Sequence, residues 1–213
     1  MQRSVAKNIL QHHVLSYQNP TRLINKIPQP PCDVFINHRG VDTKKTIASL
    51  LYDHLVRLRR RPFLDNKNMK PGDKLFEKID TAIKGCKIGV AVFSPTYCQS
   101  YFCLHELALI METKKKVIPI FCDVKPSQLR VVNDGRVPPE QIERFNMALE
   151  EAKFTVGLAF DSTKGNWSEV LTDAAEIVME SLAEVENEER MMHMRKLKFP
   201  SDVPKICSTN TGN

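Results

Sequence analysis

The sequence has no long hydrophobic run. Its longest apolar stretches are residues 88–93 and 117–122, whereas a helix that spans a membrane needs about 20 apolar residues. The start of the chain also lacks the basic, apolar and small-residue regions of a secretory signal. We therefore expect no membrane span. The expected location is the cytoplasm, with the nucleus or an organelle as alternatives.

None of the six cysteines belongs to a Cys-x-x-Cys pair, and several lie inside apolar runs. That spacing is not typical of a zinc site or of a disulfide framework. Free thiols buried in a reducing compartment explain these cysteines better. We expect no metal and no cofactor.

Acidic residues are missing from the first 32 positions, where a few basic side chains are spread among polar ones. An organelle transit peptide is one interpretation, but the arginine content is low for it. We therefore expect residues 1–30 to be a disordered basic segment.

Over the whole chain, 31 basic residues against 25 acidic ones give a net charge of +6. This modest excess permits anionic partners without identifying one.

Most of the remaining sequence alternates between short apolar runs and amphipathic helical patterns. The chain has 213 residues with 42% hydrophobic and 26% charged content, which is typical of a globular domain with tails. Helices are expected at 43–59, where Asp42 or Thr43 can cap the start, and around 76–83, 104–111, 142–152 and 166–186. Strands are expected at 32–36, 62–64, 87–93, 117–121 and 155–160.

Five strands separated by helices predict an α/β fold. We expect a flavodoxin-like five-stranded parallel sheet, in the order 2-1-3-4-5, with helices on both faces. The folded domain is expected over residues 31–186. Residues 187–213 turn acidic, then basic, then polar, and we expect them to form a disordered tail.

In such sheets, ligands bind outside the carboxyl ends of the strands. Asn37, His38, Arg39 and Gly40 follow the first predicted strand. Arginine beside glycine suits a phosphate, because the guanidinium binds phosphate oxygens and glycine allows close approach. Asp65 follows the second strand. These residues should gather at one edge of the sheet.

The third strand and the helix after it add further candidates. Ser94 follows that strand, and Phe102 and Glu106 are four residues apart on the helix, so they share a face. Residue types alone favour ordinary roles, in which Ser94 caps a turn and Glu106 is an exposed helix carboxylate.

Residues 79–107 read IDTAIKGCKIGVAVFSPTYCQSYFCLHEL, which closely resembles plant TIR (Toll/interleukin-1 receptor) domains of the immune-receptor type. Residues 32–40, CDVFINHRG, resemble the first-strand motif of that family. Residues 63–72 resemble the motif of its second strand and BB loop, and residues 117–130 its strand-four motif. The resemblance covers roughly residues 31–182, with four motifs in family order. Because no nucleotide-binding ATPase motif or leucine-rich repeat follows, we expect a TIR-only protein.

The resemblance implies an NAD(+) glycohydrolase or ADP-ribosyl cyclase. Such domains release nicotinamide and form ADP-ribose or cyclic variants, which act as second messengers in plant innate immunity and cell death. The catalytic glutamate of the family matches Glu106, its ligand-contacting arginine matches Arg39, and its serine after the third strand matches Ser94. The resemblance implies that Glu106 stabilises an oxocarbenium-like transition state.

Further contacts are implied around this set. Arg39 with Gly40 would bind the pyrophosphate, Ser94 would bind ribose or amide, and Phe102 would pack on a ring. Phe102 stands where the family usually has Trp. His38, which stands where plant members usually have Phe, and Asp65 complete the expected substrate-binding set. Family members also work as oligomers in which the BB loop completes a neighbour's site; here that loop holds Lys70, Pro71 and Gly72.

One alternative function stays open: a non-enzymatic adaptor that acts by TIR–TIR oligomerisation. A phospho-receiver would need acidic residues after the first strand and an aspartate after the third, where this chain has Ser94, so we set that function aside. Action on nucleic acids, for which the resemblance implies an accessory role of Cys103, is a minor addition. NADP(+) is a possible second substrate.

Overall fold

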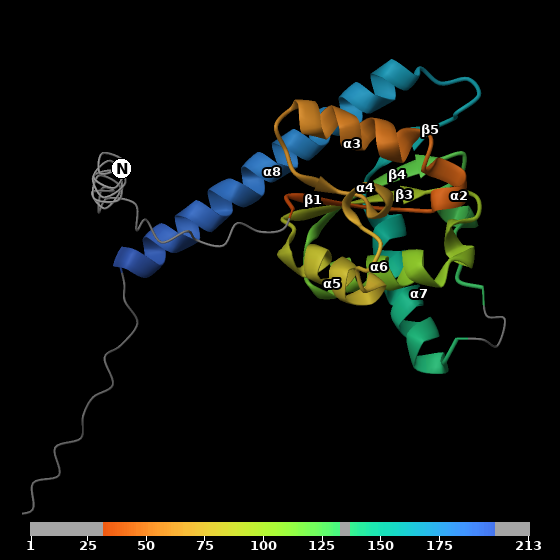
Figure 1. Ribbon diagram of the computed structural model, residues 1–213, viewed down its shortest axis with the longest axis horizontal. Helices are drawn as coiled ribbons and strands as arrows, with labels where there is room; N and C mark the ends of the chain where they lie inside the picture. Colours follow the sequence, from red (N-terminus) through yellow and green to blue (C-terminus); the bar gives the residue numbers. More distant parts are fainter. Residues whose placement is uncertain (1–31, 133–136, 199–213) are drawn as a thin grey trace, which may run out of the picture. The chain divides into compact units, whose positions relative to one another are not determined.

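The computed structural model describes residues 32–132 and 137–198. Their centre is a five-stranded sheet in which all neighbouring strands run parallel. The strands lie in the order β2-β1-β3-β4-β5 (Figure 1), so the predicted order 2-1-3-4-5 is confirmed. The strands are β1 (Val34–His38), β2 (Pro62–Phe63), β3 (Ile88–Phe93), β4 (Lys116–Cys122) and β5 (Leu158–Phe160).

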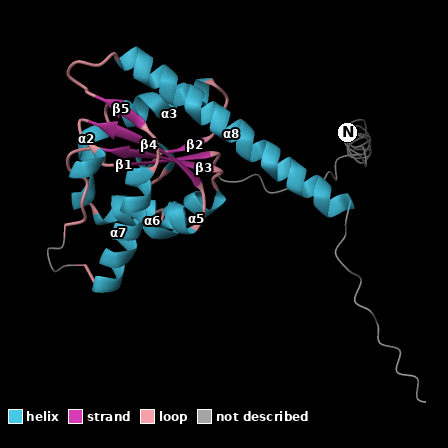
Figure 2. Ribbon diagram, turned by 180° about the vertical axis from the view of Figure 1, so that it is seen from behind, coloured by secondary structure: helices cyan, strands magenta, loops and turns pink. Residues whose placement is uncertain are grey.

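Helices cover both faces of this sheet (Figures 1 and 2). One face carries α3 (Ile47–Arg57) and α8 (Trp167–Lys198), and the other carries α5 (Leu75–Gly85), α6 (Tyr101–Glu112) and α7 (Pro139–Phe154). Because successive side chains of a strand point to opposite faces, each face has its own apolar cluster. Ile36 and Val90 belong to the α3–α8 cluster, whereas Phe35 and Phe93 belong to the α5–α6–α7 cluster. None of the helices in the described residues is both long and apolar enough to cross a membrane.

The first strand begins and ends two residues later than predicted. Its pairing with β3 continues to His38, which lies opposite Val92. The prediction ended the strand at the first polar side chain, but backbone pairing does not depend on side-chain polarity. As a result Asn37 and His38 lie inside the sheet, and Asn37 is fully buried.

The helix predicted at 43–59 is α3, which begins four residues later, and a separate short helix, α2 (Gly40–Thr43), precedes it. Asp42 does not cap a helix, and neither does Thr43. Asp42 instead accepts hydrogen bonds from side chains at the end of β3. Three further short helices connect the main elements: α4 (Asp65–Asn68), η2 (Tyr97–Gln99) and η3 (Pro126–Gln128).

Helix α8 continues past Glu186 to Lys198, so the expectation that residues 187–198 belong to a disordered tail is wrong. The ammonium group of Lys87 lies 3.4 Å from the carboxylate of Glu186 and 3.0 Å from that of Glu189. The pair with Glu189 lies beyond the predicted domain end, and the residues that follow are mostly strong helix formers, which favour continuation of the helix. The expectations for residues 1–30 and 199–213 fall outside the described residues.

Candidate active site

A cavity of about 410 Å³ opens beside the carboxyl end of β1, next to α2, α4, α5 and α6. The fold rule places ligands at this edge of the sheet. Predicted site residues in its lining are His38, Arg39, Gly40, Asp65, Phe102, Cys103 and Glu106. Lining residues without a predicted site role are Val41, Lys44, Leu75, Ile79 and Ser100.

Glu106 comes from α6, and a side chain of β1 holds its carboxylate. Nδ2 of Asn37 donates a hydrogen bond of 2.8 Å to Oε2 of Glu106. Burial raises the pKa of Glu106 to about 8; the bond from Asn37 opposes this rise, and the charges of Asp65 and Asp80 add to it. The expectation from residue types alone, an exposed carboxylate, is wrong, because Glu106 is partly buried and lines the cavity.

Asn37 is the residue of this site whose role the sequence analysis missed. It follows the predicted strand, but it lies fully buried within β1. One signal was available: a buried polar side chain needs hydrogen-bond partners, and Asn37 directly follows an apolar run. The partner itself lies 69 residues away, which no local pattern indicates.

Two buried polar atoms of the cavity wall have no hydrogen-bond partner within residues 32–132 and 137–198: Nε2 of His38 and Nε of Arg39. Leaving such an atom unpaired costs about 1–3 kcal/mol, so the wall is suited to a polar ligand. Burial lowers the pKa of His38 and Lys44 lowers it further, although the charge of Asp65 opposes them. The imidazole is therefore mainly neutral at pH 7, and because it also bonds the backbone of Ile36, Nε2 is the ring nitrogen left for a ligand.

An aromatic pair lies at the rim of the cavity. Phe102 lines the cavity, and its ring centroid lies 5.3 Å from that of Phe76 on α5. Both side chains are more than 40% exposed, so their rings are available to a planar ligand group. The packing of Phe102 on a ring of the substrate stays a prediction.

Cys103 is buried, and its thiol donates a hydrogen bond of 3.3 Å to the backbone oxygen of His38. Burial raises the pKa of Cys103 to about 12. At neutral pH the residue is a thiol, which is a poor nucleophile; its accessory role on nucleic acids stays a prediction. In the described part of the chain, no group of three or more His, Cys, Asp or Glu side chains is placed to hold a metal ion.

Ser94 does not line the cavity. It is 1% exposed, and its hydroxyl donates a hydrogen bond of 2.6 Å to Oδ2 of Asp42. The carboxylate of Asp42 also accepts bonds from the backbone N–H and the hydroxyl of Thr96. Ser94 therefore joins the end of β3 to α2, the helix that begins at Gly40. Ser94 is thus connected to the cavity through Asp42 of α2, the helix whose first residues, Gly40 and Val41, line it.

We expect Asp42→Ala to lower the free energy of unfolding by about 1–3 kcal/mol at pH 7, because it leaves the buried hydroxyl of Ser94 and the partly buried donors of Thr96 without their acceptor. Burial raises the pKa of Asp42, but the bonds from Ser94 and Thr96 outweigh it, so the net pKa lies below its ordinary value of 3.8. The carboxylate therefore stabilises the fold above pH 3.8, and this contribution disappears as pH falls through the folded pKa. Urea unfolding at several pH values measures the difference.

Asp173→Ala is the control for this prediction, because Asp173 is exposed on α8. It should leave stability nearly unchanged at every pH. An Asp42→Ala protein as stable as the wild type at pH 7 would show that the bonds from Ser94 and Thr96 contribute nothing net.

The predicted BB-loop residues lie outside the cavity lining. Gly72 has a φ of +97°, a backbone conformation that residues other than glycine rarely adopt. The backbone N–H of Lys70 donates a 2.9 Å hydrogen bond to the carboxylate of Asp73. Lys70, Pro71 and Gly72 thus form a defined turn that does not line this cavity.

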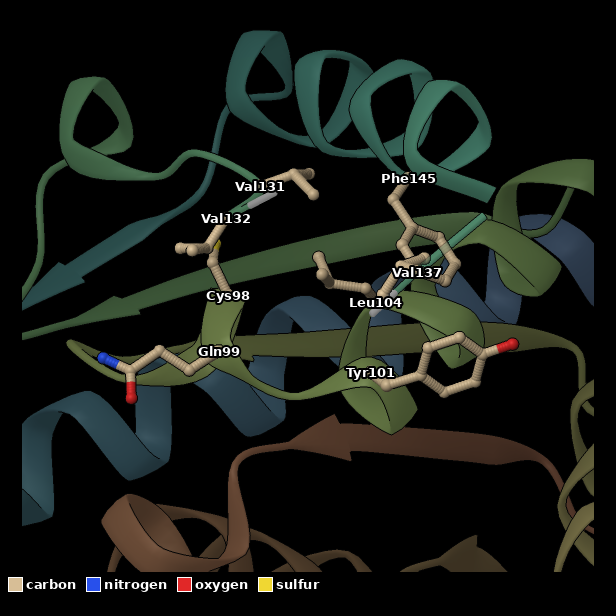
Figure 3. Close-up of a pocket in the computed structure, with 8 residues that line it drawn as sticks. All are labelled: Cys98, Gln99, Tyr101, Leu104, Val131, Val132, Val137 and Phe145. Carbon is tan, nitrogen blue, oxygen red and sulfur yellow. The ribbon is translucent and has the colours of Figure 1, made fainter. Parts of the chain in front are cut away.

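A larger cavity, of about 570 Å³, lies between α6, α7 and the segment before α7 (Figure 3). Figure 3 shows Leu104, Val137 and Phe145 side by side in its wall, with the amide of Gln99 and the hydroxyl of Tyr101 at the ends of their side chains away from this group. None of the described residues in its lining is a carboxylate, so they do not offer the acid–base chemistry of the smaller cavity.

The chain was compared with protein families and with individual proteins. The family model described as TIR domain matches residues 32–197. The probable 2′ cyclic ADP-D-ribose synthase BdTIR of Brachypodium distachyon is 51% identical over 162 residues, covering 74% of this chain and 72% of that protein. The TMV resistance protein N of Nicotiana glutinosa is 36% identical over 136 residues, covering 56% of this chain but only 12% of that protein.

A solved structure gives the same result for the fold. The TIR domains of the activated Roq1 resistosome, which directly recognises the pathogen effector XopQ, match with a TM-score of 0.60 and 28% identity. The match covers 69% of this chain and 99% of that chain.

Proposed function

This chain belongs to the TIR domain family, and we propose that it is an enzyme that cleaves NAD(+) into nicotinamide and ADP-ribose or a cyclic ADP-ribose. The observation that carries the proposal is the carboxylate of Glu106 in a cavity whose wall also holds Arg39 and the unpaired nitrogen of His38. The name of the relative from Brachypodium distachyon supports the same reaction.

The proposed chemistry breaks the bond between the ribose C1′ carbon and the nicotinamide nitrogen. The bonding electrons leave with nicotinamide, which becomes neutral, so no strong acid is needed. Positive charge then develops on the ribose, and the carboxylate of Glu106 stabilises it. Water adds at C1′ and loses a proton to give ADP-ribose, or a ribose hydroxyl of the same molecule does so to give a cyclic product. The cationic substrate itself favours the ionised form of Glu106.

The other lining residues hold the dinucleotide in this proposal. Arg39 binds the pyrophosphate, and a Cβ added at Gly40 would meet no atom within 4 Å, so the space in front of this glycine is open to the ligand. The neutral imidazole of His38 bonds a ligand hydroxyl or amide, and Asp65 accepts from a ribose hydroxyl. The exposed ring of Phe102 packs against one of the two bases.

We expect Arg39→Ala to raise KM for NAD(+) roughly 10- to 100-fold with a smaller effect on kcat, because a charge-assisted contact to the pyrophosphate is lost in ground and transition state alike. Steady-state kinetics measures both constants. Arg57→Ala, which removes an exposed arginine of α3, is the matched control and should leave KM unchanged. An unchanged KM in the Arg39 variant would remove the phosphate role.

The same proposal includes signalling in plant immunity and self-association through TIR–TIR contacts. Relatives include resistance proteins, and the Roq1 TIR domains belong to a resistosome. Those resistance proteins are much longer than the part this chain matches, 12% and 14% of their lengths. If assembly completes the site, turnover per molecule should rise with protein concentration.

The experiment that tests the proposal is NAD(+) consumption by the purified chain at high concentration, with products identified by mass spectrometry. Nicotinamide together with ADP-ribose or a cyclic isomer is the expected result, and a parallel reaction with NADP(+) measures the preference between them. Absence of nicotinamide from a protein that assembles, as checked by light scattering, would overturn the enzyme proposal and leave the adaptor.

A further inference from the structure

A chain of buried hydrogen bonds lies behind the carboxylate of Glu106. Nδ2 of Asn37 donates to Oε2 of Glu106 at 2.8 Å and to the backbone oxygen of Cys103 at 3.1 Å. The hydroxyl of Tyr97 donates to Oδ1 of Asn37, and the same backbone oxygen of Cys103 lies 3.1 Å from it. Asn37 and Tyr97 are both fully buried.

This arrangement fixes which end of the Asn37 amide faces Glu106. Burial raises the pKa of Tyr97 well above its ordinary value, so the hydroxyl keeps its proton and acts as a donor. A donor at one end of the amide selects the oxygen there, and the nitrogen then points to the carboxylate. In the flipped amide, Oδ1 would face the backbone oxygen of Cys103, which can only accept a hydrogen bond, so the contact that Nδ2 now makes there would become repulsive.

The three residues come from separate elements that meet only in the folded domain. Asn37 belongs to β1, Tyr97 to η2 and Glu106 to α6. The ring of Tyr97 packs edge-on against Phe93 at a centroid distance of 4.7 Å. The carboxylate is thus connected, through two side chains, to the aromatic core under the sheet.

We propose that Asn37 is the positioning residue of the active site, which holds one oxygen of the Glu106 carboxylate and stabilises its charged form, and that Tyr97 acts through Asn37 by fixing the orientation of the amide. The proposal rests on the proposed NAD(+) cleavage, because it assigns the role of Glu106 in that reaction.

Other charged and titratable groups also face Glu106. Asp65 from α4 and Asp80 from α5 disfavour its charged form. The protonated Tyr97 and Cys103 are neutral neighbours, while His38, Arg39 and Lys44 line the same cavity. Because the variants below leave all of these groups in place except the Tyr97 hydroxyl, a shift in titration reports on the hydrogen-bond chain.

The test is the pH dependence of kcat/KM for NAD(+), measured on the purified full chain for the wild type, Asn37→Leu, Tyr97→Phe and the double variant. In the wild type, activity should rise with pH as Glu106 ionises. In Asn37→Leu the bond to the charged carboxylate is lost, so the midpoint of the pH profile should move up by about one pH unit. This shift corresponds to a roughly tenfold lower kcat/KM at pH 7. Tyr97→Phe should move it in the same direction by less, and the double variant should match Asn37→Leu.

If Asn37 and Tyr97 had a structural role alone, their variants would lower activity without moving the midpoint of the pH profile. Asn166→Ala is the control, because it removes a bond from Ser168 at the start of α8 and should cost stability without a shift. An unmoved midpoint in Tyr97→Phe, or a double variant whose shift is the sum of the two singles, would overturn the proposal. Tyr97→Phe keeps the ring and therefore tests the proposal even when Asn37→Leu does not fold.

A second readout separates this proposal from the proposed function. The pKa of Glu106 can be followed without substrate by NMR of its side-chain carboxyl carbon. A rise in the pKa of Glu106 in Tyr97→Phe supports the positioning chain even when no variant cleaves NAD(+), whereas an unchanged pKa overturns it even when the wild type is active.

Discussion

Replacing Glu106 with alanine should lower nicotinamide release from NAD(+) by a factor of at least about 10² to 10³, with the fold intact. A loss of that size is typical when an enzyme loses one preorganised group that stabilises transition-state charge. The described lining of the cavity holds one other carboxylate, Asp65 of α4, to which the proposal gives the binding of a ribose hydroxyl. Release of nicotinamide measured by mass spectrometry, with circular dichroism as a check on the fold, tests this expectation.

The pKa of Glu106 allows an independent check that the loss is catalytic. Burial raises this pKa from 4.5 to about 8 in the folded state. Between these values the folded protein holds a proton that the unfolded chain has released, so stability falls as pH rises from 4.5 to 8. Glu106→Gln removes that dependence and should be at least as stable as the wild type at pH 8, although it is inactive. A variant that is both inactive and much less stable at pH 8 would instead indicate a structural role.

Glu112→Ala is the matched control on the same helix. Glu112 pairs with Arg144 of α7, with Oε2 at 2.9 Å from its guanidinium, and it does not line the cavity of Glu106. Its removal should cost some stability and leave nicotinamide release near the wild-type rate. Equal losses of activity in both variants would show that any change in α6 impairs the enzyme.

The sheet could be predicted because its signals are local. All six residues of β3 are buried, and a strand buried on both faces appears in the sequence as a continuous apolar run. Helical periodicity then separates one strand from the next. The ends of elements were less predictable: α8 continues to Lys198, and its Glu189 pairs with Lys87, about a hundred residues earlier in the chain.

The fold rule alone placed Arg39 and Asp65 at one edge of the sheet, whereas the role of Glu106 was predictable only from its match to the family motif. Resemblance pointed to Glu106 and Arg39, which the structure places in one cavity. It also pointed to Ser94, whose hydroxyl is bonded to Asp42, 52 residues away. Polar pairings of this kind depend on tertiary contacts, and composition or spacing does not encode them. For the same reason, Asn37 had no predicted role.

The second large effect concerns stability. We expect Phe93→Ala to lower the free energy of unfolding by about 3–5 kcal/mol, the usual cost of removing a buried phenylalanine ring. Phe93 is fully buried, with ring centroids at 4.7 Å from Tyr97 and 5.3 Å from Phe121. Urea unfolding measures the change. Phe154→Ala is the control, because Phe154 is 85% exposed at the end of α7, and it should stay within about 0.5 kcal/mol of the wild type.

The same substitution should also impair catalysis in molecules that remain folded. Phe93→Ala removes the ring against which Tyr97 packs, and Tyr97 is proposed to orient Asn37 beside Glu106. We therefore expect kcat for NAD(+) to fall more in Phe93→Ala than in Ile83→Val, a milder core change on α5 at a residue that is also fully buried, when both are assayed well below their unfolding temperatures. If the two variants lose activity equally, the core under the sheet supports the fold without positioning the carboxylate.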